Sequence, residues 1–185
     1  MIERPTLARV AVFLGARDAK HPIYKEQVQM LGKAIAKHKI ELVYGGSNTG
    51  LMRDLADAAL QQQGRVIGVT IHALADREAP HLGLSELYRV DTMHQRKAKM
   101  TELADAFIIF PGGVGTLEEF FEVYTWARLG FHSKPIGLLN IQGYYDPLLN
   151  LLDAAVEEGF VDQKGRDMLM CETDIEVLLN RLGLT

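Results

Sequence analysis

Hydrophobic positions follow two alternating patterns along the chain. Short, continuous apolar runs such as Val10–Leu14 and Ala106–Phe110 are typical of strands that are buried on both faces. Between such runs, apolar residues recur every three or four positions, as in Val28, Leu31 and Ile35, which is typical of amphipathic helices. The chain is therefore expected to alternate between strands and helices over almost its whole length.

Continuous apolar strands that alternate with helices predict a parallel sheet covered on both faces. We expect one doubly wound, Rossmann-like α/β sheet flanked by helices on both faces, in a single domain over residues 1–185. Residues 72–85 are expected to form a loop or a short irregular helix. The expected strands are Val10–Leu14, Ile40–Tyr44, Arg65–Val69, Leu87–Val90, Ala106–Phe110 and Pro135–Leu139. The expected helices are Tyr24–His38, Gly50–Gln63, His94–Leu103, Thr116–Leu129, Asp146–Glu158 and Asp174–Leu182.

Charge and composition narrow the class of protein. The net charge is −4 and no basic block stands out, which argues against a nucleic-acid partner. Cys171 is the only cysteine, so an intramolecular disulfide is impossible, which fits a reducing compartment. The first residues lack an apolar signal region, and no apolar stretch is long enough to span a membrane. We therefore expect a cytoplasmic protein with no membrane partner.

Glycine-rich turns follow three of the expected strands, at Gly15, Gly45–Gly46 and Gly112–Gly113. In doubly wound sheets, ligands bind at the carboxyl ends of the strands. The segment Pro111–Glu119 is the most informative, because a glycine turn between a strand and a helix exposes N–H groups at the positive end of the helix dipole. This turn predicts a phosphate site.

Two common phosphate motifs do not fit this turn. Glu118 stands where the dinucleotide fingerprint has its third glycine, and its carboxylate would repel a pyrophosphate. No Lys-Ser or Lys-Thr pair follows the glycines, which excludes a Walker A loop. A monophosphate therefore fits better than a dinucleotide or a triphosphate.

The carboxylates after the turn have a structural and a chemical interpretation. Thr116 to Glu119 has the pattern of a capping box, with Thr116 as N-cap and Glu119 at the third helical position. Glu118 or Glu119 also stands close enough to the expected phosphate to act on a phosphorylated substrate, and geometry alone does not choose between them. The expected apolar stripe of this helix is Leu117, Phe120, Phe121 and Tyr124.

Met93–Lys97 opens another expected helix with a cationic pair. Arg96 can bind a phosphate or carboxylate with two parallel hydrogen bonds, and Lys97 adds a point charge. Taken alone, the pair is also consistent with a solvated helix face. In the second glycine turn, Ser47, Asn48 and Thr49 are candidates to cap the next helix or to bind a ligand. The histidines show no metal-ligand spacing, so no metal site is expected.

Together these segments resemble the Lonely Guy family of cytokinin riboside 5′-monophosphate phosphoribohydrolases, long mislabelled as lysine decarboxylases. Pro111–Glu119 matches the family motif PGGxGTxxE, and Met93–Lys97 matches its second signature. Tyr44–Met52 is similar to its YGGGSxGLMG turn, and Val12–Gly15 to its first strand and turn. The resemblance covers nearly the whole chain.

The resemblance implies a nucleotide-binding domain that hydrolyses the N-glycosidic bond of adenosine 5′-monophosphate or an N6-substituted form, with no cofactor. The products would be the free base, a cytokinin or adenine, and ribose 5-phosphate. Arg96 and Glu119 match the catalytic pair, and Gly45, Gly46 and Gly112 are expected to support the phosphate and the crevice. The family is commonly homodimeric. The positions that match its substrate contacts are Glu78, Arg96, Lys97, Gly113, Val114, Gly115, Thr116, Leu117, Glu118, Glu119 and Thr125.

Some positions depart from the family pattern, and we expect them around the ligand crevice, where they bear on substrate choice. They are Ala16, Arg17, Ser47, Asn48 and Arg53. Two other functions stay open on the sequence. One is a non-catalytic carrier of a nucleotide or a pterin cofactor, and the other is an oligomeric scaffold in which Glu119 serves only as a cap.

Overall fold

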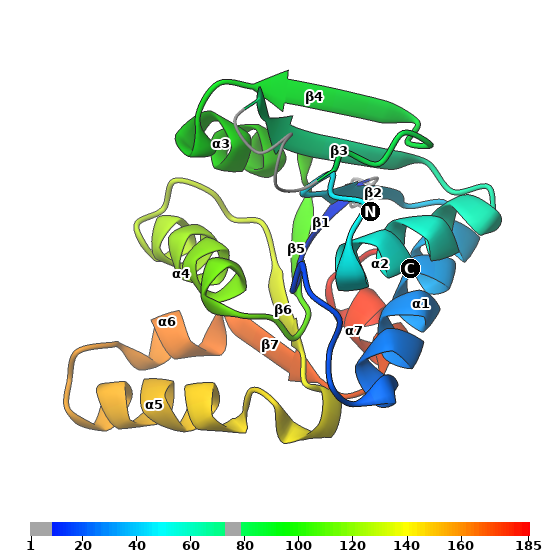
Figure 1. Ribbon diagram of the computed structural model, residues 1–185. Helices are drawn as coiled ribbons and strands as arrows, with labels where there is room; N and C mark the ends of the chain where they lie inside the picture. Colours follow the sequence, from blue (N-terminus) through cyan, green and yellow to red (C-terminus); the bar gives the residue numbers. More distant parts are fainter. Residues whose placement is uncertain (1–8, 73–78) are drawn as a thin grey trace, which may run out of the picture.

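The structure is a computed structural model that describes residues 9–72 and 79–185 (Figure 1). Over these residues the chain forms one seven-stranded sheet with the order β4-β3-β2-β1-β5-β6-β7, and all neighbouring strands are parallel. The strands are β1 (Arg9–Phe13), β2 (Glu41–Tyr44), β3 (Val66–Ile71), β4 (Glu86–Val90), β5 (Ala106–Ile109), β6 (Ile136–Leu139) and β7 (Leu169–Glu172).

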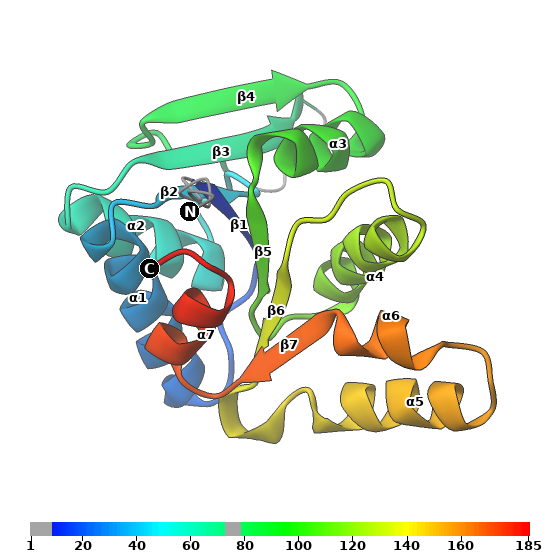
Figure 2. The ribbon, with the colours of Figure 1, turned by 180° about the vertical axis from the view of Figure 1, so that it is seen from behind.

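Helices cover both faces of the sheet, as expected for a doubly wound fold (Figures 1 and 2). α1, α2 and α7 lie on one face and α3 and α4 on the other, while α5 and α6 lie beside the β7 edge. The helices are α1 (Pro22–Lys37), α2 (Gly50–Gln61), α3 (Met93–Leu103), α4 (Val114–Arg128), the 3₁₀ turn η2 (Ile141–Gly143), α5 (Asp146–Glu157), α6 (Gln163–Asp167) and α7 (Ile175–Arg181).

Each central strand is buried on both faces, which explains why its sequence is continuously apolar. In β1, Val10 and Val12 pack into the core under α1, α2 and α7. Ala11 and Phe13 pack into the second core, under α3 and α4. The predicted doubly wound sheet is thus confirmed. The helices that contain the candidate site residues pack against the sheet through these two cores.

The direction of the strand order reverses between β1 and β5. From β1 the chain builds outward through β2, β3 and β4, and it then returns to place β5 on the other side of β1. Gly15 N donates to Pro111 O at 3.3 Å, so the turns after these two strands are in contact. Open α/β sheets bind ligands at such a switch point.

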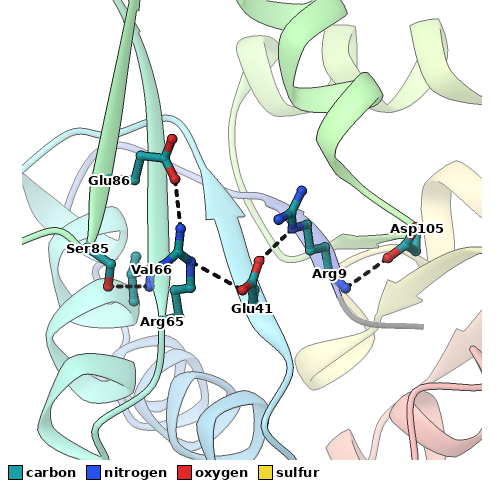
Figure 3. A network of polar contacts seen from close by, with 7 residues as sticks. All are labelled: Arg9, Glu41, Arg65, Val66, Ser85, Glu86 and Asp105. Atoms are coloured by element: carbon teal, nitrogen blue, oxygen red, sulfur yellow. Dashed lines mark hydrogen bonds and ion pairs between the residues drawn. The ribbon is translucent and has the colours of Figure 1, made fainter. Parts of the chain in front are cut away.

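The opposite end of the sheet carries a network of ion pairs (Figure 3). Glu41 pairs with Arg9 at 2.5 Å and with Arg65 at 3.2 Å, and Arg65 pairs in turn with Glu86 at 2.8 Å. Asp105 accepts a hydrogen bond from Arg9 N at 3.0 Å. These residues begin or precede β1 to β5, so the network joins five strands at the end away from the switch point.

Two expectations about the elements need correction. β7, α6 and η2 were not predicted from the sequence. α4 begins at Val114, two residues before the expected start at Thr116.

Within the described residues, no helix combines the length and the apolar character that crossing a membrane requires.

Candidate active site

A pocket of about 730 Å³ opens at the carboxyl ends of β1 and β5. The glycine turn between β5 and α4 forms one wall, and the turn after β1 forms another. α2 and α3 contribute Met52, Met93 and Arg96. The lining residues used below are Gly15, Ala16, Arg17, Tyr24, Met52, Met93, Arg96, Gly112, Gly113, Val114, Gly115, Thr116, Glu119 and Tyr144.

The N-terminus of α4 faces this pocket. Gly113 is the N-cap residue, and Leu117 N donates to Gly113 O at 3.1 Å as the helix begins. The first N–H groups of a helix have no partner within the helix, and they carry the positive end of its dipole. A Cβ at Gly113 or Gly115 would meet no atom within 4 Å, so a ligand can approach this backbone closely. The geometry is that of an anion site.

The predicted capping box at Thr116 and Glu119 is wrong. Since α4 starts at Val114, Thr116 lies inside the first turn, and no side chain caps the helix. The buried face also differs from the predicted stripe, because Val123 and Ala127 are buried whereas Phe121 is exposed. Glu119 lies on the buried face beside Phe120 and is therefore free of any capping role.

A capping box does occur at the start of α3. Thr92 Oγ1 accepts a hydrogen bond from Gln95 N at 3.2 Å, and Gln95 Oε1 accepts one from Thr92 N at 3.2 Å. The box fixes the first turn of α3, and Arg96 follows it directly. The capping box thus helps to position Arg96, and neither Thr92 nor Gln95 is itself a candidate catalytic residue.

Arg96 is buried and is held by the carboxyl ends of two strands. Its Nε donates to Val69 O at 2.9 Å, and its Nη2 donates to Gly45 O at 3.1 Å. A Cβ at Gly45 would collide with this guanidinium group. Gly45 therefore supports the crevice by making room for Arg96, while Gly46 and Gly45 both stay outside the pocket lining.

Glu119 faces the same pocket from α4 and is 9% exposed. Burial raises the pKa of Glu119 to about 7, against the opposing charge of Arg96. Glu118 and Glu122 raise this pKa further, and Lys97 lowers it. No direct ion pair joins Glu119 to Arg96 among the described residues. A carboxyl group that titrates near neutral pH is suited to proton transfer or charge stabilisation.

Lys97 is buried between α3 and α4, which excludes the solvated helix face for this pair. Its Nζ lies 2.5 Å from Glu118 Oε1 and 3.1 Å from Glu122 Oε1. Burial alone would lower the pKa of Lys97, but its hydrogen bonds to Glu118 and Glu122 raise it overall. Lys97 does not line the pocket.

Several other predicted site residues also lie outside the pocket lining. Leu117 and Glu118 lie on α4 beyond the lining, and Thr125 is exposed two turns further along the helix. Glu78 falls outside the described residues. The pocket brings together Arg96, Glu119, Gly112 and the run Gly113–Thr116.

Two tyrosines in the lining, Tyr24 and Tyr144, were not identified as site residues from the sequence, and neither was Tyr145, which lies outside the lining. Tyr144 Oη donates to Gly112 O at 2.5 Å, and Tyr145 Oη donates to Phe110 O at 2.8 Å. The two hydroxyls therefore brace the glycine turn from η2 and α5. Tyr24 meets Tyr144 edge to face, with ring centroids 6.1 Å apart. The sequence places Tyr24 only within an expected helix, and its contact with Tyr144 joins two segments that are distant along the chain.

The positions that depart from the family pattern divide into two groups. Ala16 and Arg17 line the pocket, and Arg17 is exposed. Ser47, Asn48 and Arg53 do not line it, contrary to expectation. Ser47 is buried and its Oγ lies 2.8 Å from Thr49 Oγ1, which in turn donates to Ala16 O at 3.2 Å. Any direct effect of these positions on substrate choice is thus confined to Ala16 and Arg17.

Comparison with known proteins decides the family. The profile of the family described as "Possible lysine decarboxylase" matches residues 52–182. A cytokinin riboside 5′-monophosphate phosphoribohydrolase of Rhodococcoides fascians is 51% identical over 174 residues, which cover 94% of this chain and 88% of that protein. This chain belongs to the Lonely Guy family. A plant member with the same name, from Arabidopsis thaliana, is 45% identical over 94% of this chain and 80% of its own length.

Two solved structures share the fold of this chain. A molybdenum cofactor binding protein from Rippkaea orientalis superimposes with a TM-score of 0.71 over 97% of each chain, at 18% identity. The molybdenum cofactor carrier protein of Chlamydomonas reinhardtii gives a TM-score of 0.69 over 95% of this chain and 98% of its own, at 19% identity. At such identities the likeness carries the fold alone. In the described residues, no group of three or more His, Cys, Asp or Glu side chains is arranged to hold a metal ion.

Proposed function

We propose that this protein hydrolyses the N-glycosidic bond of adenosine 5′-monophosphate or an N6-substituted form of it. The products are ribose 5-phosphate and the free base, either adenine or a cytokinin. The names of the relatives support this reaction, and no cofactor is needed. The observation that carries the proposal is that one pocket contains the open N-terminus of α4, a buried carboxyl group and a buried guanidinium group.

In the proposed mechanism the N-terminus of α4 binds the 5′-phosphate. The backbone of Gly113, Val114, Gly115 and Thr116 supplies the N–H groups, and the dipole of α4 favours the negative charge. Tyr144 and Tyr145 brace this turn, so its donors are arranged before the ligand arrives. Binding the phosphate in a fixed place also fixes the ribose relative to the side chains deeper in the pocket.

The remaining two groups act at the ribose. Cleavage of the C1′–N9 bond develops positive charge at C1′, which the Glu119 carboxylate stabilises. Glu119 also orients a water molecule. The water oxygen bonds to C1′ as the C1′–N9 bond breaks, and the proton that the water loses balances the one gained by the departing base. Two N–H groups of Arg96 are committed to Val69 O and Gly45 O. Nη1 donates a weak hydrogen bond to Met93 Sδ at 3.6 Å, and the other N–H groups of Arg96 are available for a ribose or phosphate oxygen.

A panel of nucleotides tests this function. The purified chain is incubated with AMP, an N6-prenylated AMP, GMP, CMP and adenosine, and the release of base and ribose 5-phosphate is measured. We expect release from the adenine monophosphates and not from adenosine, and we expect Glu119→Gln to lower kcat by at least about a hundredfold. Glu157→Gln, at an exposed site on α5, is the matched control.

The opposite results identify the alternatives. Tight binding of a nucleotide that is recovered intact indicates a carrier. The absence of both binding and cleavage leaves a scaffold. Either result contradicts the proposed hydrolysis.

We further propose that the chain forms a homodimer in the cytoplasm. An exposed stripe, the α4 stripe, begins at the pocket and runs along α4 to its C-cap residue; it consists of Val114, Phe121, Thr125 and Leu129. The apolar members are 39% to 85% exposed, which is unusual for a face without a partner. The α4 stripe contains Thr125, whose expected substrate contact is out of reach of its own pocket. A second copy packed on the stripe would bring Thr125 to the partner's pocket.

A further inference from the structure

Lys97 and two glutamates form an ion cluster that joins α3 to α4 next to the pocket. The Lys97 side chain is 8% exposed, and its Nζ contacts one carboxylate oxygen of Glu118 and one of Glu122. We call these three residues the Lys97 cluster. Arg96 precedes Lys97 on α3, and Glu118 precedes Glu119 on α4. The cluster therefore adjoins, in both helices, the residue that faces the pocket.

The relative position of Arg96 and Glu119 depends on how α3 and α4 pack. Successive helical residues point about 100° apart, so Arg96 reaches the strand carbonyls while Lys97 reaches α4. Arg96 is anchored to Val69 O and Gly45 O rather than to Glu119. A shift of α4 along α3 would therefore move Glu119 away from Arg96 without breaking any bond of Arg96.

We propose that Glu122 and Glu118 hold Lys97 as a positioning cluster that keeps the Glu119 carboxylate opposite Arg96 during N-glycosidic hydrolysis. This inference rests on the proposed function. Lys97 is then a positioning residue rather than a substrate contact, because it does not line the pocket and both its ionic partners belong to α4. Glu122, which belongs to none of the sequence motifs, joins the machinery as the second partner.

The cluster also sets the charge around Glu119. The charged groups that act on Glu119 are Arg96 and Lys97 from α3 and Glu118 and Glu122 from α4, while Arg17 lines the same pocket from the turn after β1. Lys97 lowers the pKa of Glu119 and Glu122 raises it. Removing Lys97 must therefore raise this pKa, whereas removing the charge of Glu122 must lower it.

Two variants with matched controls test the Lys97 cluster. Lys97→Met and Glu122→Gln remove one charge each. Lys99→Met and Glu102→Gln make the same changes in a neighbouring pair of α3, 3.0 Å apart, whose glutamate is exposed. The kinetic constants kcat and KM for AMP are measured across pH. We expect each cluster variant to lower kcat by about tenfold or more with KM changed by less than about threefold. The controls retain wild-type constants.

The pH profile separates positioning from a structural role. If the ionised Glu119 is the active form, kcat/KM falls on the acid side as Glu119 becomes protonated. We expect this acid limb to move to higher pH in Lys97→Met and to lower pH in Glu122→Gln. A mere loss of packing would not move the limb in opposite directions.

The contrary outcomes are distinct. A rise in KM at unchanged kcat in Lys97→Met would mean that Lys97 contacts substrate, and it would overturn the inference. The inference would also be overturned if the acid limbs of kcat/KM in the two variants stay at the wild-type pH or move in the same direction. If Lys97→Met fails to fold, as judged by circular dichroism, the position of the acid limb in Glu122→Gln alone tests the inference. A limb at lower pH supports it, and an unshifted limb overturns it. An inactive wild-type chain refutes the proposed function and this inference with it, whereas active wild type with unshifted variants refutes the inference alone.

Discussion

At Glu119, burial and charge act in opposite directions on one carboxyl group. Burial raises its pKa and the guanidinium group of Arg96 lowers it, and the balance lies at about 7. The protein thus keeps a carboxyl group that changes its charge in the physiological range. The free energy of holding this carboxylate in a buried site is a cost to stability, and the cost depends on pH.

Glu119→Gln should therefore stabilise the protein at neutral and alkaline pH. Because the pKa of Glu119 rises from 4.5 to about 7 on folding, the native state binds more protons than the unfolded state within this window. Its stability then falls as pH rises through the window. Glutamine does not titrate, so the variant and the wild type differ in free energy of unfolding only where Glu119 is ionised. The variant gains nothing below about pH 4.5 and is more stable by about 3 kcal/mol well above pH 7. Urea unfolding at about pH 4 and about pH 8 measures the difference. A variant that is less stable than wild type at the higher pH contradicts this account.

The central strands were the elements that the sequence identified most directly. Central strands such as β1 and β5 are buried on both faces, and their continuous apolar runs identify them. β7 is an edge strand in which only Leu169 is buried, so it has no continuous apolar run, and it was missed. The other edge strand, β4, has no buried residue and was nevertheless predicted from Leu87–Val90. The start of α4 was misplaced because valine and glycine, at Val114 and Gly115, are poor helix formers, whereas Thr116 has the appearance of a cap.

The site was predictable to the extent that it resides in motifs. The glycine turn, Arg96 and Glu119 lie in one pocket, as their motifs suggest. The direction in which Lys97 points was not predictable, because it depends on the packing of α3 against α4. Likewise, Tyr144 reaches Gly112 only because η2 places the two side by side. Such contacts depend on the positions of whole elements rather than on spacing along the chain.

The network at the amino ends of the strands stabilises the sheet far from the pocket. Replacing Glu41 by Gln removes the carboxylate that pairs with both Arg9 and Arg65, so we expect the free energy of unfolding to fall by about 1 kcal/mol. The kinetic constants should stay at wild-type values, because the network lies at the opposite end of the sheet. Denaturant melts and steady-state assays check both parts. A change in kcat would show that the two ends of the sheet are coupled.

At the scale of the whole molecule, the proposed dimer makes a prediction about mixed subunits. If Thr125 completes the partner's pocket, Glu119→Gln and Thr125→Arg chains are each inactive as homodimers. A heterodimer then contains one pocket with an intact Glu119 and an intact Thr125 from its partner. Dissociating and re-forming an equal mixture should restore about a quarter of wild-type activity. Sedimentation of the mixture confirms that dimers have formed. A mixture that stays inactive, although dimeric, contradicts a shared site.

The contact between the turns after β1 and β5 also constrains how this pocket can change. A Cβ at Gly112 would lie 2.7 Å from Gly15 N and would collide with the Thr116 side chain. Almost any substitution at Gly112 therefore requires a compensating change in a segment that is remote in sequence. Variant libraries that alter one turn at a time will return mostly inactive proteins at this position. Libraries that vary residues 15–17 together with 112–116 have access to new pocket shapes, and the same coupling predicts that the two segments co-vary during divergence of the family.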